Sequence, residues 1–422
     1  MPRFLYIAIG IAAFLLLILI LAIAGVGRRE AKPQPATLQF WGFEDDQEVW
    51  RGVIEAFRKQ YPHIDVSYRR LPERTYEETL VNSLAEGKGP DLFLLRNTAL
   101  DEHRDKIFPL PRKSSPFTPV EMARTFVDDP AALLMTEGGD LLGLPIFVDS
   151  LALFYNKDIF AANGIAQAPR TWDEAAALSQ HLTTRAENGD LVRSGLALGG
   201  SDNIAHAMEI VSAFIFQRGD AIVRGNAVAL GEGAIEALAF YTSFADSASQ
   251  NFSWTNRMLG SLDAFAEGKA AMAIGFAADS DRIRAKNPHA NFGVAPLPQL
   301  SGARAPRTYA QYWFPAVSRL SKAPQAAWQF IFYAAYPEGA ELYRERAGGR
   351  PPARRDQISR PAKTEEEDVF SRQALTAHSW QIPDEDAAPR LFEEAIESVI
   401  SRAMSPAGAI GRLREQLQLY LR

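Results

Sequence analysis

The sequence predicts an α/β protein that follows one apolar N-terminal segment. Short apolar strands alternate with amphipathic helices along most of the 422-residue chain. Strand–helix–strand repetition of this kind implies parallel strand pairing. A separate observation is the unbroken apolar run from Phe4 to Val26, which nothing later in the chain repeats. We therefore expect a globular α/β body on a single N-terminal tether.

The apolar run has two interpretations. A helix over this run would be about 34 Å long, which is enough to cross a bilayer. Ala22-Ile23-Ala24 fits the small-x-small pattern of a signal-peptide cleavage site, although the run is longer than a typical signal-peptide core. Residues 4–27 are therefore expected to be a transmembrane anchor or a signal segment. A short, proline-containing linker is expected over residues 28–36.

Composition excludes several classes of protein. Once the tether is set aside, about 390 residues remain, which favours two or three domains. The net charge is -6 and the basic residues are scattered among acidic ones, so we expect no nucleic-acid partner. The chain has no cysteine and therefore neither a disulfide nor the acylated cysteine of a bacterial lipoprotein.

The first elements of the body follow strand and helix signals. Residues 38–42 form an apolar segment that ends in a turn, and the acidic residues 44–46 then open a helix with apolar positions every fourth residue. A second strand is expected over 64–68. Thr75-x-x-Glu78 is a capping-box pattern for the next helix, which precedes another buried strand.

The same alternation continues further along the chain. Thr171-x-x-Glu174 predicts another capped helix, and residues 271–275 form an apolar strand. Helical periodicity without intervening strands marks the C-terminal part, over residues 323–336, 391–404 and 407–421. The final part of the body is therefore expected to be mostly helical.

No enzyme or metal-binding signature is present. The chain lacks a nucleophile elbow, a phosphate-binding loop, a His-Glu-x-x-His motif and a dinucleotide fingerprint. Its six histidines never fall within metal-ligand spacing of one another. The acidic run Asp384–Asp386 suits a solvated loop better than a cation site. We therefore expect no catalytic residue, no metal and no cofactor.

Tryptophans outside helix interiors are the informative residues. Trp50, Trp172 and Trp328 fall in or at the start of predicted helices, where a buried core position explains them. Four others lie at a strand end or in irregular segments, where both a cleft and a core position stay open: Trp41, Trp254, Trp313 and Trp380.

Two motifs carry a family resemblance. Residues 143–158, GLPIFVDSLALFYNKD, are followed by Pro169-Arg-Thr-Trp-Asp-Glu174. With this pair the chain resembles the family 1 extracellular solute-binding proteins of the maltose-binding type. Supporting blocks occur in the same order along nearly the whole body, at residues 38–42, 89–91, 264–272 and 291–298.

The resemblance implies a type II periplasmic-binding-protein fold, with two α/β lobes joined by a hinge of crossing strands. The first lobe would comprise residues 37–148 plus about 272–322. The second lobe would comprise residues 149–271 plus about 323–422. A ligand held between the lobes would favour their closure.

The resemblance also implies positions for ligand contacts. Asp149 falls at the first crossing, where a carboxylate can accept hydrogen bonds from sugar hydroxyls while aromatic rings stack on the sugar. Arg96, Asn97 and Phe276 stand where maltose binders carry other residues, so maltose itself is not the expected ligand. The complete set of predicted ligand-binding residues is Trp41, Glu44, Asp45, Arg96, Asn97, Asp149, Trp254, Phe276, Tyr312, Trp313, Arg350 and Trp380.

The expected function is that of the extracytoplasmic substrate-binding component of an ABC importer that binds a small solute, a carbohydrate above all. Its partners would be the transmembrane subunits of an ABC permease and, through the N-terminal helix, the cell membrane. The body would lie on the extracytoplasmic side as a monomer on a single-pass anchor. Two alternatives are a membrane-tethered receptor for signalling and a secreted glycosidase that uses two of Glu44, Asp45 and Asp149.

Overall fold

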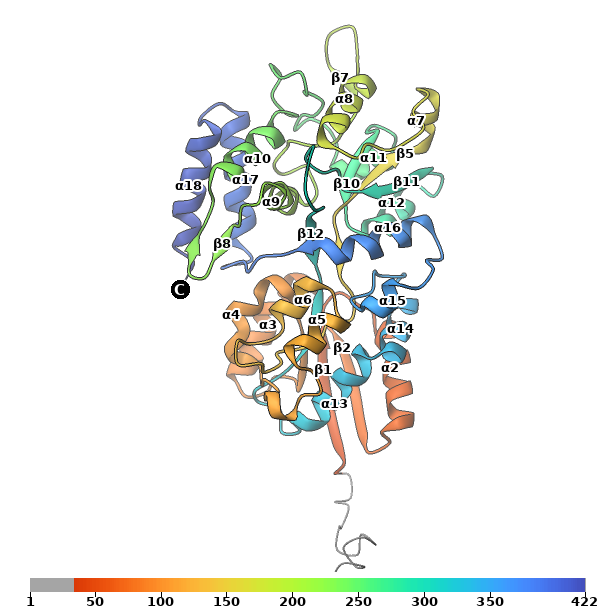
Figure 1. Cartoon of the computed structure of the whole chain (residues 1–422), viewed down its shortest axis with the longest axis vertical. Coiled ribbons are helices and arrows are strands. Elements are labelled where there is room, and N and C mark those ends of the chain that lie inside the picture. The colour runs from red at the N-terminus through yellow and green to blue at the C-terminus, as the bar shows by residue number, and fades with distance from the viewer. Residues whose placement is uncertain (1–33, 422) are drawn as a thin grey trace, which may run out of the picture.

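Two lobes joined by crossing strands make up residues 34–421, which a computed structural model describes (Figure 1). The predicted membrane segment at residues 4–27 and most of the predicted linker lie outside the described residues. Within residues 34–421, no helix combines the length and the apolar character that crossing a bilayer requires.

A four-stranded sheet in the order β13-β3-β1-β2 forms the centre of the first lobe. Its strands are β1 (Ala36–Gly42), β2 (Ile64–Arg70), β3 (Leu92–Arg96) and β13 (Trp313–Val317). As predicted, β1 runs parallel to β2 and β3, because a crossover helix returns the chain to the same end of the sheet. β13 pairs antiparallel with β3, so a distant segment completes this sheet.

Helices cover the first sheet and bury an aromatic core. They are α2 (Gln47–Gln60), α3 (Glu73–Ala85), α4 (Leu100–His103), α5 (Pro119–Thr125), α6 (Asp128–Leu133), α13 (Pro324–Ala335), α14 (Pro337–Arg346) and α15 (Arg355–Ile358). The ring centroid of Phe40 lies 4.7 Å from that of Trp50 and 5.8 Å from that of Phe330. Trp50 and Trp328 are buried, which confirms their predicted core positions. α3 begins two residues before the predicted cap Thr75, because Pro72 occupies the N-cap position.

The second lobe has a smaller sheet in the order β10-β5-β11. Its strands are β5 (Ala152–Asn156), β10 (Met272–Gly275) and β11 (Phe292–Pro296), and two short hairpins pair β6 (Thr184–Arg185) with β7 (Leu191–Arg193) and β8 (Val223–Arg224) with β9 (Ala227–Val228). Both neighbours of β5 are antiparallel to it. Parallel pairing therefore holds for adjacent units of the first lobe but does not extend to this sheet.

Helices pack around this second sheet and form the C-terminal end of the chain. They are α7 (Lys157–Ala162), α8 (Trp172–Leu182), α9 (Ala207–Gln217), α10 (Glu232–Thr242), α11 (Ser261–Ala266), α12 (Asp279–Lys286), α16 (Glu365–Gln373), α17 (Ala387–Ile400) and α18 (Pro406–Gln418). The predicted cap of α8 is confirmed, since the Thr171 hydroxyl accepts a hydrogen bond from the Glu174 backbone N–H at 3.2 Å. Trp172 is buried, as predicted.

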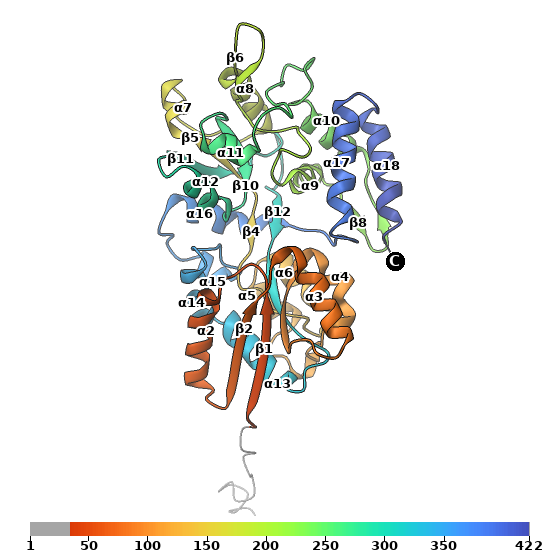
Figure 2. The same ribbon diagram turned by 180° about the vertical axis from the view of Figure 1, so that it is seen from behind.

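Three short strands connect the lobes (Figure 2). They are β4 (Asp149–Ser150), β12 (Thr308–Gln311) and β14 (Ala377–His378), in the order β14-β12-β4. β12 leads directly into β13, so one segment runs from the junction into the first sheet. The first crossing lies at Asp149, the position that the family resemblance implies.

The structure corrects the other predicted lobe boundaries. Residues 272–296 were expected in the first lobe, but β10 and β11 pair with β5 and belong to the second. Residues 323–346 were expected in the second lobe, but α13 and α14 contribute Trp328, Phe330 and Tyr343 to the first hydrophobic core. Both errors have the same cause, because strand pairing and helix packing between distant segments leave no local sequence signal.

Candidate ligand-binding cleft

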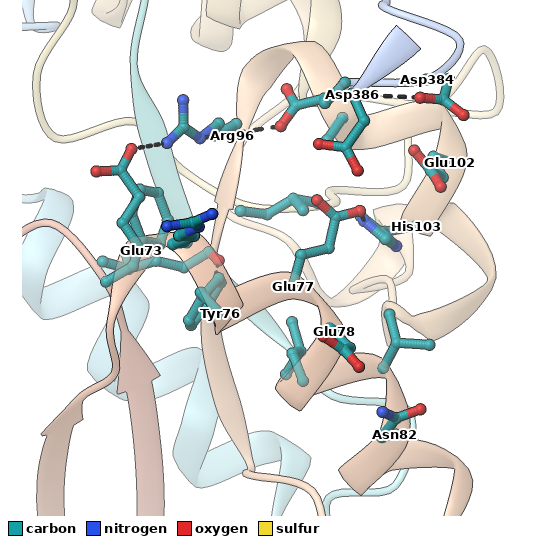
Figure 3. A pocket seen from close by; sticks show the side chains of 18 residues that line it. Glu73, Tyr76, Glu77, Glu78, Asn82, Arg96, Glu102, His103, Asp384 and Asp386 are labelled. Atoms are coloured by element: carbon teal, nitrogen blue, oxygen red, sulfur yellow. Dashed lines mark hydrogen bonds and ion pairs between the residues drawn. The ribbon is translucent and has the colours of Figure 1, made fainter.

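A cavity of about 620 Å³ lies between the lobes (Figure 3). The first lobe lines it with Phe43, which follows β1, and with residues of α3, the end of β3 and α4, including Tyr76 and Arg96. The loop before α17 lines the opposite side with Asp384–Asp386. The ends of β1 and β3 bring these first-lobe residues together, because the carboxyl ends of parallel strands meet at one edge of a sheet.

Another cavity, of about 690 Å³, lies beside β11 and α16 and is lined largely by second-lobe residues such as Pro296 and Val369. The first lobe contributes none of its sheet residues to that lining. A ligand there would not bridge the two lobes. The cavity that contains Arg96 is therefore the better candidate for a ligand that couples them.

Arg96 connects the two sides of this interlobe cavity. Its guanidinium forms an ion pair with Glu73 of the first lobe and lies 3.9 Å from the Glu385 carboxylate on the opposite side. The same guanidinium lies 5.0 Å from the centroid of the Phe43 ring. Burial raises the pKa of Glu385, whereas the neighbouring positive charge of Arg96 opposes this increase. Arg96 is thus a predicted site residue that the structure places in the cavity.

Asn97, the next predicted site residue, has a structural position instead. Its side chain is completely buried. The amide oxygen accepts a hydrogen bond from the Tyr312 backbone N–H at 3.0 Å, and the amide nitrogen donates to the Ala310 carbonyl at 3.5 Å. Tyr312 is also buried, and its hydroxyl donates to Asp129 at 3.0 Å. Asn97 and Tyr312 therefore fasten β3 and α6 to the crossing segment.

Four other predicted residues meet in a second group, which we term the Arg350 cluster: Glu44, Asp45, Trp313 and Arg350. The Arg350 guanidinium nitrogen Nη2 lies 3.4 Å from Glu44 Oε1 and 3.6 Å from Asp45 Oδ1. The guanidinium also lies over the Trp313 ring, 4.4 Å from its centroid, and over the Phe147 ring at 4.7 Å. Only 12% of the Arg350 side chain is exposed, so this arginine is a buried centre of the cluster.

Asp45 is the most enclosed acid of the Arg350 cluster. Its carboxylate accepts hydrogen bonds from the Trp50 indole N–H at 3.1 Å and from the Tyr343 hydroxyl at 2.9 Å. Burial raises the pKa of Asp45, and the positive charge of Arg350 opposes that shift. Because these donors already use the carboxylate, Asp45 orients Arg350 and has little capacity left for a ligand.

The carboxylate of Asp149 is also used by donors within the protein. Its Oδ1 accepts hydrogen bonds from the backbone N–H groups of Ser150 at 2.7 Å and Ala277 at 2.9 Å, and its Oδ2 accepts one from Ala278 at 3.3 Å. Burial raises the pKa of Asp149 to about 6. The carboxylate thereby ties the first crossing strand to the segment between β10 and α12.

Phe276 belongs to a small second-lobe group that sequence reasoning missed in part. Its ring lies edge to face with His206, with centroids 4.7 Å apart. His206 Nε2 lies 2.8 Å from Asp279 Oδ2, and this oxygen also accepts a hydrogen bond from the Phe276 backbone N–H at 2.8 Å. His206 has a φ of 62°, a left-handed conformation that few residues other than glycine adopt. No spacing rule pairs His206 with Asp279 in the sequence.

The remaining predicted tryptophans do not line the interlobe cavity. Trp254 is completely buried in the second core, where its indole N–H donates to Asn203 at 2.9 Å. Trp380 is buried against Phe392. Trp41 is 8% exposed, and its ring lies 5.3 Å from the Arg69 guanidinium. For each of these three positions, the core alternative describes the structure better than the cleft alternative.

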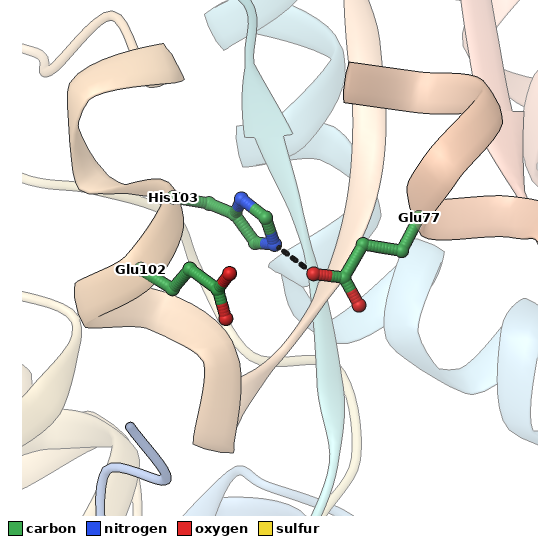
Figure 4. A group of neighbouring side chains, drawn as sticks. All are labelled: Glu77, Glu102 and His103. Carbon is green, nitrogen blue, oxygen red and sulfur yellow. Dashed lines mark hydrogen bonds and ion pairs between the residues drawn. The ribbon is translucent and has the colours of Figure 1, made fainter. Parts of the chain in front are cut away.

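Glu77, Glu102 and His103 line the cavity but were not predicted site residues (Figure 4). His103 Nε2 lies 2.7 Å from Glu77 Oε1, and one donor atom from each of the three residues lies within 4.8 Å of the others. This hydrogen bond lowers the pKa of Glu77, whereas burial raises that of Glu102. Sequence spacing could not reveal the group, because only the packing of α3 beside α4 brings Glu77 to His103.

The sequence profile of the bacterial extracellular solute-binding proteins matches residues 42–341. Maltodextrin-binding protein MdxE of Bacillus subtilis is 23% identical over 315 residues, which cover 71% of this chain and 70% of the relative. A binding protein of Brucella abortus is 24% identical over 284 residues, or 66% of each chain, which is just under two thirds of the relative's length.

Solved structures show the same fold at low sequence identity. The cyclic α-maltosyl-1,6-maltose binding protein of Arthrobacter globiformis is 17% identical with a TM-score of 0.77, and the match covers 92% of this chain and 99% of that one. The sugar-binding protein MalE of Xanthomonas citri is 22% identical with a TM-score of 0.75, and the match covers 91% and 97%. The profile match spans well over half of the sequence, and the chain therefore belongs to the bacterial extracellular solute-binding protein family.

Proposed function

We propose that this chain is the substrate-binding component of an ABC importer and that it holds a carbohydrate between its lobes. The observation that carries the proposal is the interlobe cavity of about 620 Å³, to which both lobes contribute side chains. Support comes from the relatives, one of which is a maltodextrin-binding protein, and from a neighbour of the same fold that was solved with maltotetraose. The protein acts by binding and performs no covalent chemistry.

The arrangement suits a ligand that favours lobe closure. A molecule that contacts Arg96 on one side and the 384–386 loop on the other binds the closed state better than the open state. Phe43 and Tyr76 form an apolar base to the same cavity, where they are 2% and 6% exposed, and such apolar walls suit the apolar faces of sugars. We therefore place the ligand beside Phe43, Tyr76 and Arg96.

The Arg350 cluster and Phe276 form the second part of the proposed site. Arg350 lies between aromatic rings and two acids, so its guanidinium is held in one orientation. The Nε of Arg350 is buried and has no hydrogen-bond partner among the described residues. It is a donor that a sugar hydroxyl oxygen could satisfy once the lobes rearrange around a ligand. The predicted residues to which we assign structural roles are left out of the proposed site: Trp41, Asn97, Trp254, Tyr312 and Trp380.

Residues 4–27 are proposed to hold the body at the extracytoplasmic face of the membrane, next to the permease subunits. Separation of membranes from soluble material in the native host tests the anchor, because a cleaved signal segment would release the protein. Co-purification with transmembrane permease subunits would support the importer, whereas co-purification with a sensor kinase would favour a signalling receptor.

Thermal stabilisation of the full chain in detergent tests the binding function. Maltooligosaccharides, amino-sugar oligosaccharides, amino acids, peptides and polyamines form the panel. A ligand present at 100 times its dissociation constant stabilises the folded state by about 2.7 kcal/mol. A shift with one class of sugar supports the proposal. A shift with amino acids or peptides alone would overturn the carbohydrate assignment.

A further inference from the structure

Acidic side chains dominate the lining of the interlobe cavity. Carboxylates come from both sides of the cavity: Glu73, Glu77, Glu78, Glu102, Asp384, Glu385 and Asp386. The arginines in the lining are Arg74 and Arg96. A carbohydrate in this cavity would therefore face an excess of negative charge.

Internal pairing removes only part of this excess. Arg96 is shared between Glu73 and Glu385, and Glu77 is hydrogen-bonded to His103. Within residues 34–421 no ion pair involves the carboxylates of Glu78, Glu102, Asp384 or Asp386. Asp384 only accepts backbone hydrogen bonds from residues 386 and 387, at 3.0 and 2.7 Å. The uncompensated carboxylates thus lie on both sides of the cavity, as Figure 3 shows for Glu102, Asp384 and Asp386.

Lobe closure around a neutral ligand would make this arrangement less favourable. Closure removes water from the carboxylates and brings those of the two sides together, and both changes disfavour the ionised forms. Burial already raises the pKa values of Glu102 and Glu385. A positively charged ligand would reverse both effects. Its charge would replace the lost hydration of the carboxylates and would offset the repulsion between them.

We propose that the carbohydrate bound in this cavity carries protonated amino groups, as an oligosaccharide of glucosamine does. The inference rests on the proposed function and specifies its substrate class. Ammonium groups would occupy the space between Glu102 on α4 and the 384–386 loop, while the sugar rings lie over the wall that Arg96, Phe43 and Tyr76 form. A neutral maltooligosaccharide of the same length would bind less tightly.

A divalent metal ion is the competing occupant, because Glu77, Glu102 and His103 lie close enough to share one. Two observations favour the amino sugar. The Nδ1 of His103 has no partner among the described residues, whereas a metal-bound histidine usually has its second nitrogen held by a hydrogen bond. In addition, the uncompensated acids extend to Asp386 across the cavity and do not converge on one point.

Calorimetry with the full chain in detergent tests the inference. The probes are a glucosamine tetrasaccharide, its fully N-acetylated form and maltotetraose, at a pH where the free amines are charged. We expect the glucosamine tetrasaccharide to bind at least about tenfold more tightly than either neutral sugar, and the difference to shrink at high salt. Equal or tighter binding of the neutral sugars would overturn the inference while leaving the carbohydrate function in place.

Two variants test whether the cavity carboxylates cause the preference for the amino sugar. Glu102→Gln and Asp386→Asn should each reduce the affinity for the glucosamine tetrasaccharide several-fold, with little change for any neutral sugar that binds. Glu187→Gln, at an exposed acid outside the cavity, is the matched control and should change neither affinity. An unchanged amino-sugar preference in both cavity variants would overturn the inference.

The remaining outcomes separate the proposals. Failure of every sugar to bind would overturn the proposed function together with the inference. Stabilisation by Zn²⁺ alone that is lost in Glu102→Gln, without any preference for amino sugars, would overturn the inference in favour of a metal site.

Discussion

The Arg350 cluster and the interlobe cavity both contain acids beside an arginine, but they differ in how far the charges are matched. In the Arg350 cluster, Asp45 is 3% exposed and has Trp50, Tyr343 and Arg350 as partners. In the cavity, Glu102 is exposed and forms no ion pair with any residue between 34 and 421. A buried acid must be matched within the protein, whereas a solvated acid can stay available for a ligand. The contrast separates a charge cluster that is matched within the protein from a cavity whose acids are left for a ligand to match.

Arg350→Met should show the largest effect on stability. The substitution leaves Asp45 buried without its counter-ion, so we expect the free energy of unfolding to fall by about 3–5 kcal/mol. Urea unfolding measures the change. Arg96→Met is the matched variant in the cavity, where the closer partner, Glu73, is hydrated and should limit the loss to about 1 kcal/mol. Equal losses in the two variants would remove the distinction between the regions.

Asp149→Asn tests the buried acid at the first crossing through its pH dependence. Because burial raises the pKa of Asp149 from 3.8 to about 6, the folded state holds this proton more tightly than the unfolded chain does. The associated stability is fully present below about pH 4 and is lost as the pH rises to about 6, with a span of about 3 kcal/mol.

Urea unfolding at several pH values between these limits measures this dependence for the native chain and the variant. The slope of stability against pH should be flatter in Asp149→Asn, since asparagine does not titrate. Parallel curves for the two proteins would contradict the prediction.

Tyr343→Phe removes one hydrogen bond to the Asp45 carboxylate without changing the ring. We expect a loss of about 2 kcal/mol, the usual range for a hydrogen bond to a charged group. Tyr333→Phe is the control, because the Tyr333 hydroxyl has no partner among the described residues and its loss should change stability by at most about 0.5 kcal/mol. Thermal unfolding of both variants measures the two losses. Equal losses would argue against a specific role for the hydrogen bond between Tyr343 and Asp45.

Glu102→Gln should have the smallest effect on the ligand-free protein. The Glu102 carboxylate makes no ion pair in the part of the chain that the structure describes, and burial and the neighbouring acids oppose its charge, so stability should stay within about 0.5 kcal/mol of the native value or rise slightly. Urea unfolding without ligand provides the measurement. A large loss would show that Glu102 belongs to a matched cluster like that of Arg350.

The candidate site could be predicted only in part. Local motifs led to Glu44, Asp45, Arg96 and Arg350, which are close to the ligand-binding surfaces that we propose. They could not distinguish Asn97 and Tyr312, whose partners are buried contacts with distant segments. Glu77 and His103 were missed because neither lies in a recognisable motif. Only the packing of α3 beside α4 brings the two side chains together.

The sequence by itself determined the α/β class, the family and the buried helix tryptophans, and the resemblance to that family implied the first crossing at Asp149. These features follow from periodicity and motifs that extend over a few residues, where the interacting residues are also close in the sequence. Only the tertiary structure decided which lobe receives residues 272–296 and 323–346, and which acids are paired with an arginine. Those outcomes depend on contacts between segments far apart in the chain, such as Asp45 with Tyr343, and no local pattern encodes which distant partner will be buried against a given side chain.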